Sequence, residues 1–187
     1  VRGSDPRAVA GLEVIRSFAV AVLFLAIPVF AQGPPKPEAQ IAAMSKLGYM
    51  AGTWTGEGYF DFGGRRATFR GSEVVQSKLG GTALLVEGSF FSTINDREVP
   101  VHTTLGVISY DPKTANYRFA SWLATGGSGE HELTLTEKGW RWDLTSPRGT
   151  TRYEMTLTEE GDWLETGVRS ADGTKWDKFF EMRLKKQ

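Results

Sequence analysis

From Thr53 to the end of the chain, apolar and polar residues alternate with a period of two, and turn signals interrupt the alternation at short intervals. This period is typical of β-strands that bury one face. The interruptions are hairpin-sized and rich in Gly, Asp, Asn and Pro, which tight turns prefer. The pattern predicts about ten strands, over the ranges Thr53–Phe62, Ala67–Ser77, Thr82–Ser92, Val101–Tyr110, Tyr117–Ala124, Glu130–Thr136, Trp140–Thr145, Thr150–Thr158, Trp163–Ser170 and Lys175–Leu184.

No helical pattern lies between these strands, and this excludes the crossover connections of a parallel sheet. A sandwich and a closed barrel are the two architectures that remain. Uniformly short connections favour a meander, and closure of the sheet removes its exposed edges. We therefore predict an all-β fold, an antiparallel up-and-down β-barrel of about ten strands.

The segment before the strands has a helical pattern, from Pro37 to about Tyr49. Glu38 suits the positive end of a helix dipole, and Gly52 ends the pattern. The apolar residues of one helical face are Ile41, Met44, Leu47 and Met50. A short N-terminal helix is expected, which closes one end of the barrel with this face; a helix that binds a partner is the alternative.

The N-terminal region contains an apolar run, Phe18 to Ala31, that follows Arg16. Small residues, Val29 and Ala31, occupy the two positions that a signal peptidase reads. The run is shorter than the roughly 20 residues that a membrane-spanning helix needs. These features predict a signal peptide that is cleaved after Ala31, and a retained N-terminal anchor is the alternative.

The predicted organisation is therefore a signal peptide at 1–31, a Pro-rich spacer at 32–37 and a barrel domain at 38–187, with Val14 as an alternative start. The chain has no cysteine, which excludes disulfides, thiolate nucleophiles and Cys-ligated metals. Export without disulfides fits a bacterial periplasm or bacterial secretion better than a eukaryotic exterior. After cleavage no stable membrane span is expected.

The charge balance narrows the classes of partner. Basic and acidic residues number 22 each, so the net charge is zero. No basic excess favours nucleic acid or an anionic membrane surface as a partner. The sequence leaves the oligomeric state open.

Three short motifs carry a resemblance to known proteins: Gly52-Thr-Trp-Thr-Gly-Glu-Gly58, Gly106-Val-Ile-Ser-Tyr-Asp111 and Met182-Arg-Leu184. The first, which opens a strand after a short helix, resembles the calycin superfamily of lipocalins, fatty-acid-binding proteins and nitrobindins. The three together are still more similar to bacterial lipocalin-like barrels of unassigned function with a GxWxGxG opening. The resemblance covers roughly residues 46–185.

The resemblance has two implications for individual residues. In lipocalin-like barrels the motif tryptophan packs beneath an arginine of the last strand, which implies a structural floor made by Trp54 and Arg183 through a cation–π contact. Nitrobindins bind haem through a histidine of the last strand, but here the corresponding region holds Phe179 and Phe180 and no histidine. We therefore expect no haem cofactor, unless a histidine ligates it from another wall.

Only two histidines are present, His102 and His131, and both lie near strand ends, where they are expected to face the barrel mouth. A histidine with carboxylate neighbours is a candidate base or metal ligand. However, Glu130 and Glu132 flank His131 in a strand and so point to the opposite face. No metal site is expected, and no Gly-x-Ser-x-Gly nucleophile motif occurs.

Parity along the strands predicts an apolar interior. The candidate ligand-binding residues are Phe60, Leu105, Val107, Phe119, Trp142, Met155 and Phe180. Four strand carboxylates, Glu57, Glu87, Glu154 and Glu165, are each a possible interior acid, and most are expected to face solvent.

Ten strands make a wide barrel, and Gly56 and Gly58 leave space along the first strand. The function that follows is the binding of a small hydrophobic molecule inside the barrel. One alternative is an enzyme that uses His102, His131 and Glu130 at the mouth. The other is a structural or partner-binding module of the envelope with a filled barrel.

Overall fold

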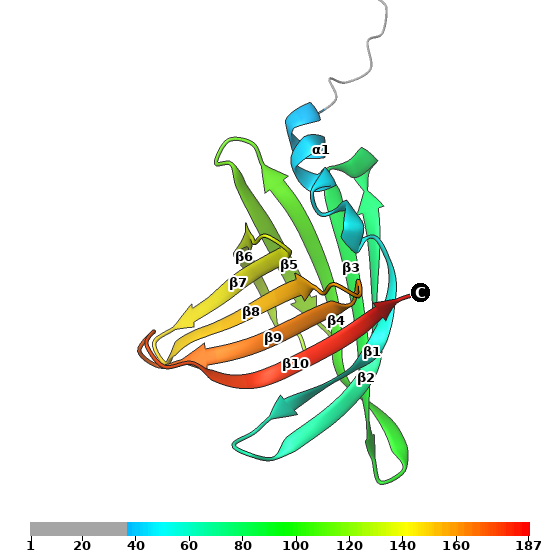
Figure 1. Cartoon of the computed structure of the whole chain (residues 1–187), viewed down its shortest axis with the longest axis vertical. Coiled ribbons are helices and arrows are strands. Elements are labelled where there is room, and N and C mark those ends of the chain that lie inside the picture. The colour runs from blue at the N-terminus through cyan, green and yellow to red at the C-terminus, as the bar shows by residue number, and fades with distance from the viewer. Residues whose placement is uncertain (1–36) are drawn as a thin grey trace, which may run out of the picture. The chain divides into compact units, whose positions relative to one another are not determined.

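The computed structural model describes residues 37–187 as a closed barrel of ten antiparallel strands preceded by one short helix (Figure 1). The all-β prediction is confirmed. The predicted signal peptide and nearly all of the predicted spacer lie outside the described residues. The strands are β1 Gly52–Asp61, β2 Arg66–Lys78, β3 Ala83–Ile94, β4 Arg97–Asp111, β5 Asn116–Leu123, β6 Ser128–Leu135, β7 Gly139–Ser146, β8 Gly149–Leu157, β9 Trp163–Ser170 and β10 Asp177–Lys186.

Each strand pairs with its neighbours in sequence, and β1 also pairs with β10 to close the barrel. Trp54 lies opposite Lys186 and Phe60 opposite Phe180 across this closing seam. Because the chain runs up and down, successive hairpin turns lie alternately at the two ends of the barrel. One end is covered by the helix, and the other carries the turns after β1, β3, β5, β7 and β9.

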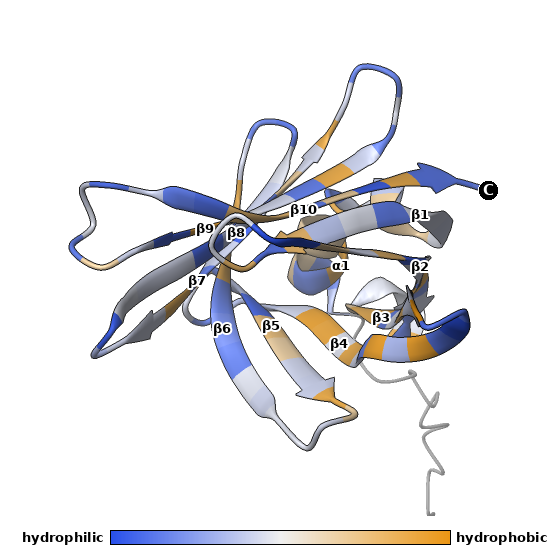
Figure 2. Ribbon diagram, turned by 90° about the horizontal axis from the view of Figure 1, so that it is seen from below, coloured by the Kyte–Doolittle hydropathy of each residue, from blue (hydrophilic) through white to orange (hydrophobic). Residues whose placement is uncertain are grey.

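Helix α1 (Glu38–Ser45) and a following 3₁₀ turn, η1 (Gly48–Met50), lie at one end of the barrel. Figure 2 views the barrel from the opposite end, with α1 behind the ring of strands. Met44, Leu47 and Met50 are almost completely buried, as the apolar stripe predicts. The α-helix ends earlier than expected, ahead of Gly48, a residue that helices tolerate poorly. In the described part of the chain, no helix is long and apolar enough to cross a membrane.

Two buried hydrogen bonds attach this cover to the barrel. The Tyr117 hydroxyl donates to the Ala43 carbonyl oxygen over 2.8 Å, and Trp54 Nε1 donates to the Met50 carbonyl oxygen over 2.7 Å. Each of the two bonds gives a hydrogen-bond partner to a polar group that water does not reach. The motif tryptophan therefore fixes η1 onto the first strand.

Gly52 begins β1 with φ of +137°, a conformation that side chains rarely adopt. A Cβ atom at this position would lie 2.7 Å from Cε of Lys186 on the closing strand. The first glycine of the opening motif therefore permits both the turn out of η1 and the close approach of β10.

Strand β4 is longer than the prediction, which began at Val101. It starts at Arg97 and includes Pro100, which lacks the N–H that a strand ladder needs. The pairing of β3 with β4 shifts register between Phe90 and Phe91, opposite Pro100. This irregularity accommodates the proline within a continuous strand.

Candidate ligand-binding site

The barrel encloses a cavity of about 470 Å³. Met50, Trp140 and Trp163 line its inner end, near α1. Five lining residues remain exposed: His102, Leu123, Gly127, Ser128 and Leu144. They lie toward the hairpin turns at the end opposite α1, so the cavity opens at that end.

The cavity wall is mainly aromatic. Phe60 packs against Phe69 and Phe180, with ring centroids 5.2 Å and 5.0 Å away. On the other side Trp142 stacks on Tyr153 with centroids 4.8 Å apart and planes 17° apart. Rings fixed by several neighbours in this way form a rigid apolar wall. Such a lining with few polar groups is characteristic of small-molecule sites.

Small residues on the inner face make room for these large side chains. A Cβ atom on Gly106 would lie 2.8 Å from Cε2 of Phe119, and one on Gly58 would lie 2.5 Å from Cζ of Phe69. The rings thus lie across the neighbouring strand. Glycines in these strands are places where a side chain from an adjacent strand passes over the backbone.

The structure brings together four of the seven predicted interior residues, Phe60, Phe119, Trp142 and Phe180, on the cavity wall. Met155 is also inside and fully buried, but it packs near the covered end, where its sulfur lies 4.0 Å from the Tyr49 hydroxyl. Their role in ligand binding stays a prediction.

The prediction that Leu105 and Val107 face the interior is wrong. The alternate residues of β4, including Thr104, Gly106 and Ile108, line the cavity, and Leu105 is 40% exposed on the outer face. Apolar residues occur on both faces of this strand, so its pattern does not define the inner face. The inner position at Gly106 has no side chain, because Phe119 occupies the space above it.

The predicted floor of Trp54 and Arg183 also needs correction. Arg183 is exposed on the outer face, where its guanidinium pairs with Asp162 over 3.2 Å. Its neighbours in β10 point inward, so the arginine must point outward. The cation over the Trp54 ring is Lys186, with Nζ 5.1 Å from the ring centroid.

Both histidines line the cavity. His131 lies near the start of β6, but His102 lies inside β4, because that strand begins at Arg97 and not at Val101. His131 lies against Trp142 with ring centroids 4.7 Å apart, and His102 lies 6.2 Å from Phe90. Partial burial lowers the pKa of both imidazoles, so both favour the neutral form at neutral pH. Among the described residues, no group of three or more His, Cys, Asp or Glu side chains is placed to hold a metal ion.

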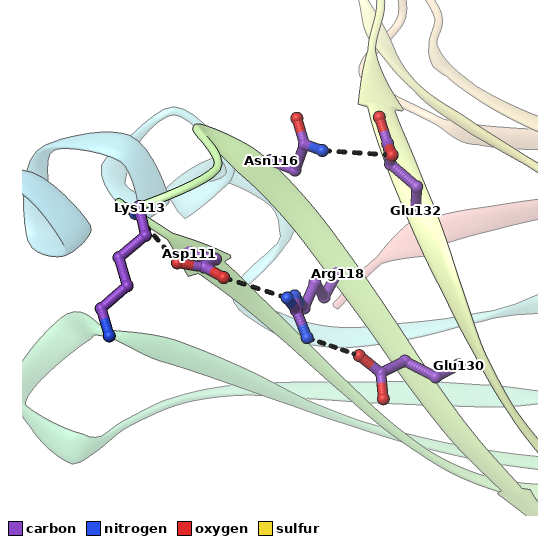
Figure 3. Close-up of polar contacts among 6 residues, drawn as sticks. All are labelled: Asp111, Lys113, Asn116, Arg118, Glu130 and Glu132. Carbon is purple, nitrogen blue, oxygen red and sulfur yellow. Dashed lines mark hydrogen bonds and ion pairs between the residues drawn. The ribbon is translucent and has the colours of Figure 1, made fainter.

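Glu130, the proposed carboxylate partner of the histidines, lies on the outer face. Arg118 pairs with it over 3.0 Å and with Asp111 over the same distance (Figure 3). Asn116 donates to Glu132 over 3.2 Å in the same region. The alternation of the strand therefore separates both carboxylates from His131.

Two carboxylates in the cavity, one buried and one half-buried, are the main polar feature of the site. Glu73 on β2 is 8% exposed, and Glu165 on β9 faces the same cavity. Glu165 was one of four candidate interior acids, whereas Glu73 was missed by the sequence reasoning. Glu73 has the same parity as Phe69 and Val75, both buried, so a signal for its position was present.

Burial raises the pKa of both carboxyl groups. That of Glu73 rises to about 8, through burial first and then through the negative charge of Glu165. That of Glu165 rises to about 7 through burial, although a hydrogen bond of 3.2 Å from Trp163 Nε1 opposes the rise. These shifts mean that the two acids compete for ionisation near neutral pH.

Two buried polar atoms at the cavity have no hydrogen-bond partner among the described residues, Glu73 Oε2 and Trp140 Nε1. The other oxygen of Glu73 and the Thr104 hydroxyl both lie within 3 Å of the point where a Gly88 Cβ would stand. Gly88 thus gives the carboxylate its space. Unpaired buried polar atoms are rare in native proteins and are frequently completed by a ligand or water.

Comparisons with known proteins identify the fold and go no further. No protein-family model matches the chain, and no curated protein matches it. Among solved structures, the chain is similar to the crystal structure of Rv2717c from M. tuberculosis, with a TM-score of 0.55 and 12% sequence identity. The match covers 78% of this chain and 97% of that chain. At this identity the similarity supports the β-barrel fold alone.

Proposed function

We propose that the protein binds a small, largely apolar molecule inside its barrel and that, after export, it acts as a carrier or binding protein of a bacterial envelope. The observation that supports this most strongly is the aromatic cavity of about 470 Å³, which opens at the end opposite α1. A filled barrel would leave no such space. The proposal includes the calycin-like relationship that the motifs around Trp54 and Arg183 suggest.

The cavity is a better candidate than the mouth for the functional chemistry. Glu130 is engaged by Arg118 on the outer face, so the histidines lack the carboxylate that an enzyme at the mouth would use. Haem is not part of the proposal, because β10 presents Phe180 to the cavity and no histidine. Added haemin is expected to show no shift of its Soret band that depends on His102 or His131.

The test is native mass spectrometry of protein purified under mild conditions, followed by organic extraction and identification of any bound molecule. A matched pair of variants localises the site. Ser121→Phe places a ring inside, because Ser121 lines the cavity between Gly106 and Gly129, whereas Thr103→Phe places the same ring on the exposed outer face of β4.

We expect a bound apolar molecule that Ser121→Phe loses and Thr103→Phe retains. Probe binding gives the same comparison for protein that is purified empty: tryptophan fluorescence is expected to respond to small aromatic probes in the control and much less in Ser121→Phe. Protein that carries no molecule and binds no apolar probe would overturn the proposed function.

A further inference from the structure

The polar groups inside the cavity are unbalanced in charge. Glu73 and Glu165 both face it, and among the described residues that line it there is no lysine and no arginine. The remaining titratable side chains of the lining are His102, His131 and Tyr153. Burial lowers the pKa of both imidazoles, so neither supplies a positive charge at neutral pH. Burial raises the pKa of Tyr153 to about 12, so its phenol is neutral.

The strands packed against Glu73 do not place a positive charge beside its carboxylate either. Its cross-strand neighbours are Trp54 on β1 and Gly88 on β3, and Thr104 on β4 lies beside Gly88. Glu165 lies between Met155 on β8 and Met182 on β10, and its one side-chain hydrogen bond is from the neutral indole of Trp163. A buried carboxylate without a cation is costly, and proteins retain such groups chiefly at functional sites.

We propose, building on the binding function above, that the ligand is an amphiphilic cation, a molecule with an apolar body and a protonated amine, and that Glu73 and Glu165 bind its ammonium group. The ammonium supplies the hydrogen-bond donors that Glu73 Oε2 lacks. The indole rings of Trp140 and Trp163, 6.1 Å apart and nearly perpendicular, offer aromatic faces at the same end of the cavity.

The surroundings favour an organic cation over a metal ion. Hard metal ions need about six oxygen ligands, and this cavity offers two carboxylates in an aromatic wall. An organic amine instead places its apolar body against Phe60, Phe119 and Tyr153, which line the wider part of the cavity. An oxygen atom on the ligand would in addition satisfy the unpaired Trp140 Nε1 donor.

A matched set of probes tests this class: phenylbutylamine, phenylbutanol and phenylbutyrate, which share one apolar body and differ in charge. Their affinities are measured by calorimetry at about pH 6 and about pH 8. The amine stays protonated over this range, since alkylammonium groups have pKa values of about 10. The carboxyl groups ionise over it, so binding of the amine releases protons and strengthens with pH.

We expect the amine to bind about tenfold more tightly than the alcohol at about pH 8, and the butyrate to bind most weakly. The affinity for the amine rises about tenfold from pH 6 to pH 8, while that for the alcohol stays constant. Glu73→Gln and Glu165→Gln each reduce the preference for the amine. Glu57→Gln, on the exposed outer face of β1, leaves it unchanged.

Binding of phenylbutanol serves as the folding control, because the Gln variants keep the apolar wall and are expected to bind the alcohol as the parent does. Equal affinity for all three probes, or a preference for the alcohol or butyrate, would overturn the cation proposal and leave the binding function standing. Failure of all three probes to bind would contradict both proposals.

Discussion

Carboxylates on the two faces of this barrel wall differ in their surroundings. On the outer face Asp111 and Glu130 share the guanidinium of Arg118, and Asp111 also accepts a hydrogen bond of 2.9 Å from the Lys113 backbone N–H. On the inner face Glu73 and Glu165 share a cavity that has no basic side chain among its described lining residues.

The pKa values move in opposite directions as a result. The backbone N–H of Lys113 and the charge of Arg118 lower the pKa of Asp111, whereas burial raises the pKa of Glu73 to about 8. The same side-chain chemistry is thus stabilised as an anion outside and held near its protonated form inside. An outer carboxylate forms part of the surface, while an inner one is available to a ligand.

The largest expected effect is on stability at high pH. The folded pKa of Glu73 is raised, so the stabilisation it contributes is fully present below its unfolded pKa of about 4.5 and is lost as pH rises through about 8. Glu73→Gln removes this pH-dependent loss of stability, because an amide does not ionise. We expect the variant to be more stable than the parent by about 4–5 kcal/mol at about pH 9 and by less than about 1 kcal/mol at about pH 5.

Urea unfolding at the two pH values measures this difference. Glu57→Gln, an exposed outer-face substitution, provides the control and should follow the parent at both. A constant difference between Glu73→Gln and the parent across pH would show that the carboxyl of Glu73 titrates normally.

A cation introduced beside Glu73 should stabilise its ionised form, as Arg118 does for Asp111 on the outer face. Thr104 is the position for it, because its hydroxyl and the Glu73 carboxylate approach the same point above Gly88. Thr104→Lys is expected to lower the pKa of Glu73 and to weaken phenylbutylamine binding about tenfold, or about 1.4 kcal/mol. Thr103→Lys carries the same charge on the exposed outer face and is the control. Equal amine affinity in the two variants would contradict the assignment of Glu73 to ammonium binding.

The smallest effect is expected on the outer face. Arg118 is 48% exposed and Glu130 is 59% exposed, so water screens their attraction. Arg118→Leu should cost less than about 1 kcal/mol in thermal or urea unfolding and raise the pKa of Asp111 modestly. Lys113→Ala keeps the backbone N–H and should leave that pKa nearly unchanged. If Arg118→Leu lowered the free energy of unfolding by several kcal/mol, the ion pairs of Arg118 would be a major source of barrel stability, contrary to this account.

The regular alternation made most of the fold predictable. Turn residues divide the chain into ten segments, and the predicted strand ranges match the observed ones within a few residues for all but the start of β4. The alternation also predicted which residues face inward in strands that have apolar residues on one face only. Examples are β1, with Phe60, and β7, with Trp142. The start of β4 could not be predicted, because Pro100 normally ends a strand. The register shift that accommodates this proline depends on the partner strand β3.

The site was less predictable for a physical reason. In β4 both faces are apolar, so Leu105 could not be told from the inner residues by pattern alone. The family resemblance implies that Arg183 faces Trp54, whereas the parity of Met182 and Leu184, both buried, places the arginine on the outer face. Glu73 was missed because a strand carboxylate usually faces solvent, although it shares its face with the apolar residues Phe69 and Val75.

The most direct test of the account is an NMR titration of the glutamate side-chain carboxyl carbons, with and without phenylbutylamine. We predict that Glu73 and Glu165 titrate with pKa values of about 8 and about 7 in the free protein. Saturating amine should shift both midpoints downward, since the cation stabilises the ionised carboxylates. Midpoints near the ordinary glutamate value, unmoved by the amine, would contradict the account of an uncompensated acid pair in a ligand cavity.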